Sequence, residues 1–352
     1  MKASDKEPSL RRKIFVVGLI IFSMIMTTGL FYGYQIVKTP NVLVDKQARV
    51  VLIPKGADFK QVQNLLYDED IVQDLVTFSL VAKWMDYDKL VKPGLYQLES
   101  SMTNIETVRL LRSGAQIPTR ITFNNIRTLE ELAGKITKGI DIDSLSFLTR
   151  IKSPEVWQKY EFEEQNFISM FIPNTYEVYW TTTADELLDR MHREYKNFWT
   201  ENRIAKAKAL NMKPNEVITL ASIVNAESQK RDESPTIAGL YLNRLKRGIP
   251  LQADPTLVFA HGDFEIRRVL NVHKEIDSPY NTYKYAGLPP GPINLPPVYA
   301  IDAVLNPAEH NYIYMCAKED FSGYHNFTNN LGEHLRNAQR YQAALNRSRI
   351  YQ

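Results

Sequence analysis

The sequence has little that would support disulfide, metal or nucleotide chemistry. Its one cysteine, Cys316, cannot form an internal disulfide, so a cysteine-rich secreted scaffold and a multi-cysteine zinc site are excluded. The six histidines lack HExxH or another tight ligand spacing, and neither a P-loop, a GxGxxG loop nor a GxSxG elbow is present. We therefore expect no metal and no cofactor. The apolar run before Cys316 predicts a buried core thiol.

Net charge is absent from most of the chain. The total is +3 at pH 7, and residues 1–13 hold five basic and two acidic side chains. The other 339 residues hold 38 basic and 38 acidic side chains. A neutral body has no long-range attraction for phosphate backbones, so we expect no nucleic-acid partner.

One long apolar run follows the basic N-terminus. Residues 14–37 are uncharged, and as a helix they would span about 36 Å, enough for a hydrocarbon core of about 30 Å. The positive-inside rule places the basic residues 1–13 in the cytoplasm. A cleaved signal peptide is the alternative, but its apolar region is normally about 7–15 residues long. We predict an uncleaved, single-pass anchor in a bacterial inner membrane, with an extracytoplasmic (periplasmic) body.

Residues 38–116 have the pattern of a small module of mixed strands and helices. Alternating apolar residues predict strands at 48–53 and 94–98, and helical spacing predicts helices near 58–67 and 75–85. Thr103 and Glu106 form a capping box for a further helix that ends at Gly114. From the residues alone, this module is either a binding module or a stalk.

Residues 117–352 predict a larger domain, and the whole extracytoplasmic part an α+β fold. A strand is expected at 118–123, and helix start signals occur at Thr128, Thr183, Pro214 and Ser234. Residues 139–165 give no clear pattern. Residues 251–330 are rich in proline and asparagine and predict loops, a composition typical of a cleft, before a last helix at 338–347.

Glu227 is the carboxyl best placed for acid/base chemistry. It follows an apolar face that recurs at helical spacing, formed by Val217, Leu220, Ala221 and Val224. At roughly 100° per residue, Glu227 lies about 70° from the centre of this face. A half-buried carboxyl there would have a raised pKa, as a general acid requires. Periodicity alone favours the simpler interpretation, a glutamate at a helix end that points to water.

Residues 218–228, ITLASIVNAES, resemble the active-site helix of the MltG-type (YceG-like) endolytic murein lytic transglycosylases. Further similar motifs follow in the family's order: GLYLNRL at 239–245, LQADPT at 251–256, YNTY at 280–283, GLPPGPI at 287–293 and HNFTNN at 325–330. The resemblance covers nearly the whole chain and is strongest over 218–330. It implies a transmembrane anchor (14–37), a LysM-like α/β module (38–116) and an α+β YceG-like catalytic domain (117–352).

The resemblance also implies the reaction and its setting. The substrate would be peptidoglycan glycan strands, cut at the MurNAc–GlcNAc bond to leave a 1,6-anhydro-MurNAc end. The anchor would restrict this reaction to nascent strands near inner-membrane lipid, and the family resemblance implies association with cell-wall synthases. Two alternatives remain open: a hydrolytic muramidase that uses Glu227 with Asp254, and a non-catalytic peptidoglycan-binding division scaffold.

The catalytic role transfers to Glu227 alone. Family members often carry two acidic residues two positions apart here, and this chain has Asn225 at the first of them. Ordinary glycosidases use two carboxyl groups, whereas a lytic transglycosylase needs only one. Glu227 would protonate the leaving oxygen and then accept the proton of the sugar's own C6 hydroxyl.

Six residues in the matching motifs are expected to bind substrate: Gln252, Asp254, Tyr280, Asn281, Phe327 and Asn329. Each has an alternative interpretation. Asp254 equally suits a cap for a short helix that begins at Pro255. Tyr280 and Asn281 equally suit a turn, and for Phe327 and Asn329 packing is the stronger interpretation.

Overall fold

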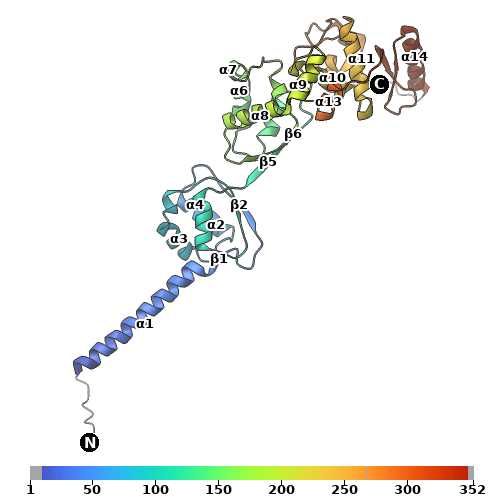
Figure 1. Cartoon of the computed structure of the whole chain (residues 1–352). Coiled ribbons are helices and arrows are strands. Elements are labelled where there is room, and N and C mark those ends of the chain that lie inside the picture. The colour runs from blue at the N-terminus through green and yellow to red at the C-terminus, as the bar shows by residue number, and fades with distance from the viewer. Residues whose placement is uncertain (1–9, 267, 348–352) are drawn as a thin grey trace. The chain divides into compact units, whose positions relative to one another are not determined.

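The computed structural model describes residues 10–266 and 268–347, and the chain forms two compact units (Figure 1). The N-terminal unit comprises residues 1–119 with 179–181, and the C-terminal unit comprises 120–178 with 182–352. Residues 1–9 of the expected cytoplasmic tail and residues 348–352 of the expected catalytic domain lie outside the described residues.

The N-terminal unit begins with a long apolar helix, α1 (Leu10–Lys38). Its most apolar 18-residue window has a mean hydropathy of 2.4 and no part of that window is buried. The helix is long and apolar enough to cross a membrane, which confirms the predicted N-terminal apolar helix. The helix begins four residues before the predicted run, and the basic residues 11–13 belong to its first turn.

The remainder of this unit is a small α/β module. Its elements are β1 (Pro40–Val42), β2 (Arg49–Ile53), α2 (Phe59–Asp68), α3 (Leu75–Trp84), η1 (Tyr87–Lys89), β3 (Gly94–Leu98), β4 (Met102–Thr103) and α4 (Asn104–Ser113). Two antiparallel strand pairs, β1–β4 and β2–β3, pack with the helices around one apolar core. The predicted strands and helices are confirmed, and so is the capping box of Thr103 and Glu106.

Two buried asparagines tie α1 to the module. The Asn104 side-chain amide donates to the carbonyl of Ile36, in the last turn of α1, at 3.3 Å. It also accepts from the Asn41 amide at 2.7 Å, and Asn41 exchanges two further hydrogen bonds with the backbone of Asp74, the N-cap of α3. Buried amides are costly unless all are paired, so this network fixes one arrangement of α1, β1, α3 and α4.

The first part of the C-terminal unit packs helices around paired strands. It contains most of β5 (Pro118–Phe123), α5 (Leu129–Ile136), α6 (Ser144–Ile151), α7 (Pro154–Lys159), η2 (Phe167–Met170), most of β6 (Asn174–Tyr179) and α8 (Ala184–Phe198), with β5 beside β6. Residues 139–165, which gave no sequence pattern, include α6 and α7. Their apolar residues join the same core as α5 and α8.

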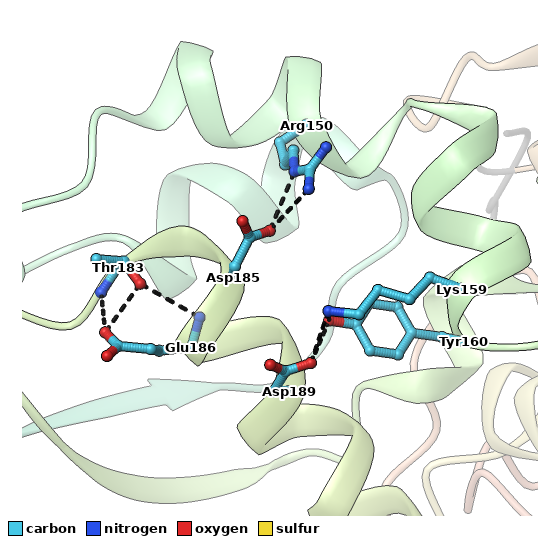
Figure 2. Close-up of polar contacts among 7 residues, drawn as sticks. All are labelled: Arg150, Lys159, Tyr160, Thr183, Asp185, Glu186 and Asp189. Atoms are coloured by element: carbon cyan, nitrogen blue, oxygen red, sulfur yellow. Dashed lines mark hydrogen bonds and ion pairs between the residues drawn. The ribbon is translucent and has the colours of Figure 1, made fainter.

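Polar contacts on α8 hold it against α6 and α7 (Figure 2). Arg150 of α6 pairs with Asp185, whose carboxylate lies 3.0 Å from the guanidinium. Lys159 and Tyr160, at the end of α7, both donate to Asp189, at 2.9 and 2.7 Å. These surface ion pairs each contribute little energy, typically below about 1 kcal/mol, so the shared apolar core remains the main contact between these helices.

The second part of the C-terminal unit is built around α10 (Pro214–Glu227). Around it lie α9 (Glu201–Ala209), η3 (Arg231–Glu233), α11 (Ser234–Lys246), α12 (Asp254–His261), η4 (Asn271–Glu275), α13 (Val298–Leu305), β7 (Tyr314–Ala317), β8 (His325–Thr328) and α14 (Leu331–Arg347). Helices α9, α11, α12 and α13 all contact α10. Every residue from 217 to 224 is buried, so the helix is enclosed on all sides and the single apolar face inferred from spacing was too narrow.

The prediction of loops over 251–330 was incomplete. The region contains α12, α13 and the antiparallel hairpin β7–β8. The apolar helix α13 was missed because a proline-rich stretch precedes it, and proline inside a helix disrupts it. Pro297 lies just before the helix, however, and does not interrupt it. The last helix begins at Leu331, seven residues before the predicted start.

Gly239 in α11 provides a test of this packing. A Cβ atom there would lie 2.5 Å from the Ala308 carbonyl oxygen, and a backbone atom cannot yield as a flexible side chain can. We expect Gly239→Ala to lower the unfolding temperature of the C-terminal unit, at a cost of about 1–3 kcal/mol. Gly134 in α5 is the matched control, since its Cβ would meet nothing within 4 Å. Gly134→Ala should stabilise by up to about 1 kcal/mol, and equal shifts in thermal unfolding would contradict the assignment.

Candidate active site

A polar cavity of about 300 Å³ lies in the C-terminal unit, beside the end of α10. One wall comes from α10 and α11, with Glu227, Tyr241 and Arg244. The loop that enters α12 contributes a second wall, and the hairpin β7–β8 with α14 a third. The cavity therefore collects side chains from segments that lie up to about a hundred residues apart in the chain.

Glu227 is the last residue of α10, and its half-buried carboxylate faces this cavity. The hydroxyl of Tyr241 donates to its Oε1 atom at 2.6 Å. Burial raises the pKa of Glu227 to about 7, and the charge of Asp254 adds to the rise, while the Tyr241 hydrogen bond and the Arg244 charge oppose it. Near neutral pH the carboxyl can thus both give and take a proton.

Tyr241 and Arg244 stand one turn apart on α11, so they share a face of that helix. Tyr241 is fully buried. Burial, and then the neighbouring Glu227 charge, raise the pKa of its phenol well above the usual value, so the phenol stays a neutral hydrogen-bond donor. The Arg244 guanidinium is also buried and donates to the carbonyls of Ile313 and Leu251, at 2.6 and 2.7 Å. It therefore holds two loops in place around the cavity.

Gln252 and Asp254, two of the predicted substrate-binding residues, line the cavity. Asp254 begins α12, and its carboxylate accepts a hydrogen bond from the hydroxyl of Tyr283. Gln252 has a φ of +52°, a strained value for a residue with a side chain, and its N–H donates to Thr282. The strained turn lets the exposed Gln252 side chain and the Asp254 carboxylate both reach the cavity.

Tyr280 and Asn281 do not line the cavity. Tyr280 packs on Phe259, with ring centroids 4.7 Å apart, and burial raises its pKa to about 12. Asn281 is fully buried. Its side-chain amide donates to the backbone carbonyls of residues 274 and 276 and accepts from the N–H of Tyr283. The pair thus shapes the loop that presents Tyr283, and direct contact with substrate stays a prediction.

Phe327 and Asn329, at and after β8, also lie outside the cavity lining. The Phe327 ring stacks on Tyr312 with centroids 6.0 Å apart and packs against the core around α10. Asn329 is exposed. Their role in binding stays a prediction.

The hairpin wall contains a histidine, His325, that was not among the predicted site residues. Glu233, which is buried, accepts from both the backbone N–H and the Nδ1 side of His325, at 2.8 and 2.9 Å. Glu233 also accepts from Ser228, the residue after Glu227, at 3.2 Å. Glu233 therefore connects β8 to the end of α10. The Nε2 atom of His325 takes no part in the bond to Glu233. The available signal was the HNFTNN motif, from which we selected Phe327 and Asn329.

Two further residues of this wall were not expected in the cavity. Cys316 is half-buried and lines the cavity, so the prediction of a buried core thiol was wrong. It lies in β7, and this strand of a two-stranded hairpin forms part of the cavity wall. His334 of α14 stacks on Tyr314, and burial lowers the pKa of its imidazole. His334 therefore enters the cavity wall as a neutral ring.

Asn225, at the position where the resembled family often has an acid, has a structural contact. Its side-chain oxygen accepts from the hydroxyl of Tyr299 in α13 at 2.8 Å. Asn294 donates to the carbonyl of Ser222 in the same helix at 3.0 Å. The amide thus helps to dock α13 and the proline-rich segment on α10. Within residues 10–266 and 268–347, no group of three or more His, Cys, Asp or Glu side chains could hold a metal ion.

The fold and the site define a class of protein in which one half-buried carboxyl with a near-neutral pKa faces a polar cavity at a helix end. A sequence model of the YceG-like family matches residues 51–340, and the chain belongs to that family.

Named relatives extend this comparison. The chain is 28% identical to proteins named endolytic murein transglycosylase from two Streptococcus pneumoniae strains, D39 and R6, over 92% of this chain and 64% of theirs. The protein of the same name from Bacillus subtilis strain 168 is 26% identical over 92% of both chains. A crystal structure of a yceG-like protein from Listeria monocytogenes is similar in fold, with a TM-score of 0.55 at 24% identity, covering 82% of this chain and 98% of that chain.

The raised pKa of Glu227 predicts that the ionised carboxylate lowers the free energy of unfolding at neutral and alkaline pH. In the unfolded chain the carboxyl ionises near pH 4.5, and in the folded chain near pH 7. Stability from this group is therefore fully present below about pH 4.5 and is lost as pH rises to about 7, by at most about 3 kcal/mol. Glu227→Gln removes the cost, so at pH 8 the variant should unfold at a higher temperature than the wild type.

The same comparison at pH 4.5 should show a smaller difference, because both states of the wild type then hold the proton more fully. Glu164→Gln is the control, since Glu164 is an exposed carboxylate. An advantage of Glu227→Gln that does not change between pH 4.5 and pH 8 would contradict the assignment.

Proposed function

We propose that this chain is an endolytic peptidoglycan transglycosylase with Glu227 as its acid/base residue. The observation that carries the proposal is a single carboxyl whose pKa is raised to about 7, held by Tyr241 at the edge of a polar cavity. Relatives named endolytic murein transglycosylase support it, with 26–28% identity over 92% of this chain. The chain spans 64% of the Streptococcus relatives, so the activity of those proteins is carried over only as a proposal.

The proposed reaction consumes no water molecule. Protonated Glu227 gives its proton to the glycosidic oxygen as the bond from that oxygen to C1 of N-acetylmuramic acid breaks. The C6 hydroxyl of the same sugar then attacks C1 and transfers its proton to the Glu227 carboxylate. The products are a 1,6-anhydro end and a free hydroxyl on the leaving sugar, and Glu227 is protonated again. General acid/base assistance of this kind typically contributes about 10²–10⁴-fold.

The surrounding residues suit this proton cycle. A general acid works best when its pKa is close to the working pH, because it must be protonated first and a competent base later. The Asp254 charge raises the pKa of Glu227, and the Tyr241 hydrogen bond limits that rise. Asp254, held by Tyr283, would also stabilise positive charge on the sugar ring in the transition state.

Substrate contacts are assigned by position. Gln252 and Asp254 line the cavity and would bind sugar hydroxyl and amide groups. His325, fixed by Glu233, faces them from the hairpin. Tyr280, Asn281, Phe327 and Asn329 would support these contacts from outside the cavity lining.

The proposed layout follows the predicted domains. Residues 1–13 would be cytoplasmic, 14–37 would span the inner membrane, and 117–352 would form the periplasmic catalytic domain. Residues 38–116 would be a LysM-like module, which the element order β2–α2–α3–β3 supports. Inner-membrane lipid and cell-wall synthases are the proposed partners besides the glycan strand.

The direct test is digestion of purified glycan strands by the full chain in detergent, with products identified by mass spectrometry. We expect anhydro-ended fragments from the wild type and from Glu164→Gln, and a loss of at least about 10²-fold for Glu227→Gln, because the proton donor is removed. Reducing-ended fragments would identify a hydrolase. A folded wild type that releases no fragments would support the scaffold alternative.

Asp254 separates the transglycosylase from the hydrolytic muramidase. In a transglycosylase, Asp254→Asn should keep anhydro product but move the alkaline limb of the pH–rate profile to lower pH, because the Asp254 charge raises the pKa of Glu227. In a hydrolase that uses Asp254 as its second carboxyl, the same change should abolish cleavage. Asp277→Asn is the matched control, since Asp277 also accepts a tyrosine hydroxyl, that of Tyr285, but does not line the cavity.

A further inference from the structure

Helix α3 of the small module carries an exposed apolar stripe. Val76, Leu80 and Trp84 recur every fourth residue and are 70%, 54% and 72% exposed. The opposite face of the helix, with Phe78 and Val81, is buried in the module core. Side chains four apart lie on one face of a helix, so the stripe is continuous. It is not needed to complete the core.

Helix α3 starts next to the point where α1 ends. Helix α3 contacts α1 (Figure 1), and its N-cap, Asp74, is bound by Asn41 in the network that also holds the carbonyl of Ile36. No linker separates α1 from the module, because the Thr39 N–H still bonds to Gln35 and β1 begins at Pro40. If residues 14–37 span the bilayer, α3 therefore starts at the level of the lipid headgroups.

The composition of α3 suits that level. Tryptophan prefers the membrane–water interface, where its ring is in an apolar layer and its N–H reaches polar groups. Lys83 precedes Trp84, and the helix contains no Asp or Glu, so nothing on it repels anionic headgroups. A helix of ten residues is about 15 Å long, and interfacial helices bury their apolar face about 5–10 Å into the headgroup and acyl boundary.

We propose that α3 is a membrane-contact helix, and that Val76, Leu80 and Trp84 insert into the outer interface of the bilayer that α1 crosses. The inference rests on the proposed anchor. It gives the module a second attachment beside α1, so that the module lies on the lipid surface and cannot rotate freely about the anchor.

Tryptophan quenching in proteoliposomes tests this contact. The full chain is reconstituted in vesicles of phosphatidylethanolamine and phosphatidylglycerol, with and without lipids brominated near the headgroup end of the acyl chain. We expect the brominated lipids to quench an emission component that is lost in Trp84→Phe. The matched control is Trp180→Phe, which removes another, half-buried tryptophan of the same unit and should leave that component unchanged.

A charge substitution gives the second arm. Leu80→Asp places a charge on the stripe and should abolish the quenching of Trp84, whereas Tyr67→Asp, at a 60% exposed position of α2, should not. Both positions are exposed, so neither change disturbs the core. Quenching that is the same in the wild type and in Trp84→Phe, in protein that floats with the vesicles, would overturn the proposal and leave the anchor standing. Protein that does not float with vesicles would overturn both.

Discussion

The site depends on keeping one carboxyl half-buried at the end of α10, a helix whose residues 217–224 are all buried. Glu227 tolerates this position because Tyr241 donates to it at 2.6 Å from the neighbouring helix. That hydrogen bond joins α10 to α11, two helices in contact. On α11, Gly239 also permits the close approach of the Ala308 carbonyl oxygen. The cost of burying the carboxyl appears as its raised pKa, and that same property makes it suitable as an acid and then as a base.

Buried polar side chains hold the loops that form the rest of the cavity wall. Arg244 binds backbone carbonyls of two loops, and Asn281 binds the loop that presents Tyr283. Glu233 joins β8 to the end of α10 through His325 and Ser228. Because each of these groups is buried and would be costly if unpaired, their bonding fixes positions that a proline-rich chain would otherwise leave variable.

Local signals in the sequence were sufficient for several elements. The uncharged run of α1 and the capping box of Thr103 needed only neighbours in the chain. In contrast, α13 was hidden by the prolines before it, and α10 showed one apolar face although it is buried all round. Burial on the remaining sides comes from tertiary contacts with α9, α11, α12 and α13, and spacing within one helix carries no information about them.

The sequence by itself determined the family motifs, the N-terminal apolar helix and Glu227 as the candidate acid/base residue, because these depend on residue type and local order. Only the tertiary structure decided which other groups meet that carboxyl. Tyr241, Arg244, Tyr283 and His325 lie in motifs that were recognised, yet nothing local distinguished them from the residues beside them. The pKa of Glu227 depends on burial and on charged groups of α11 and α12. These groups come close to the carboxyl only when the chain has folded.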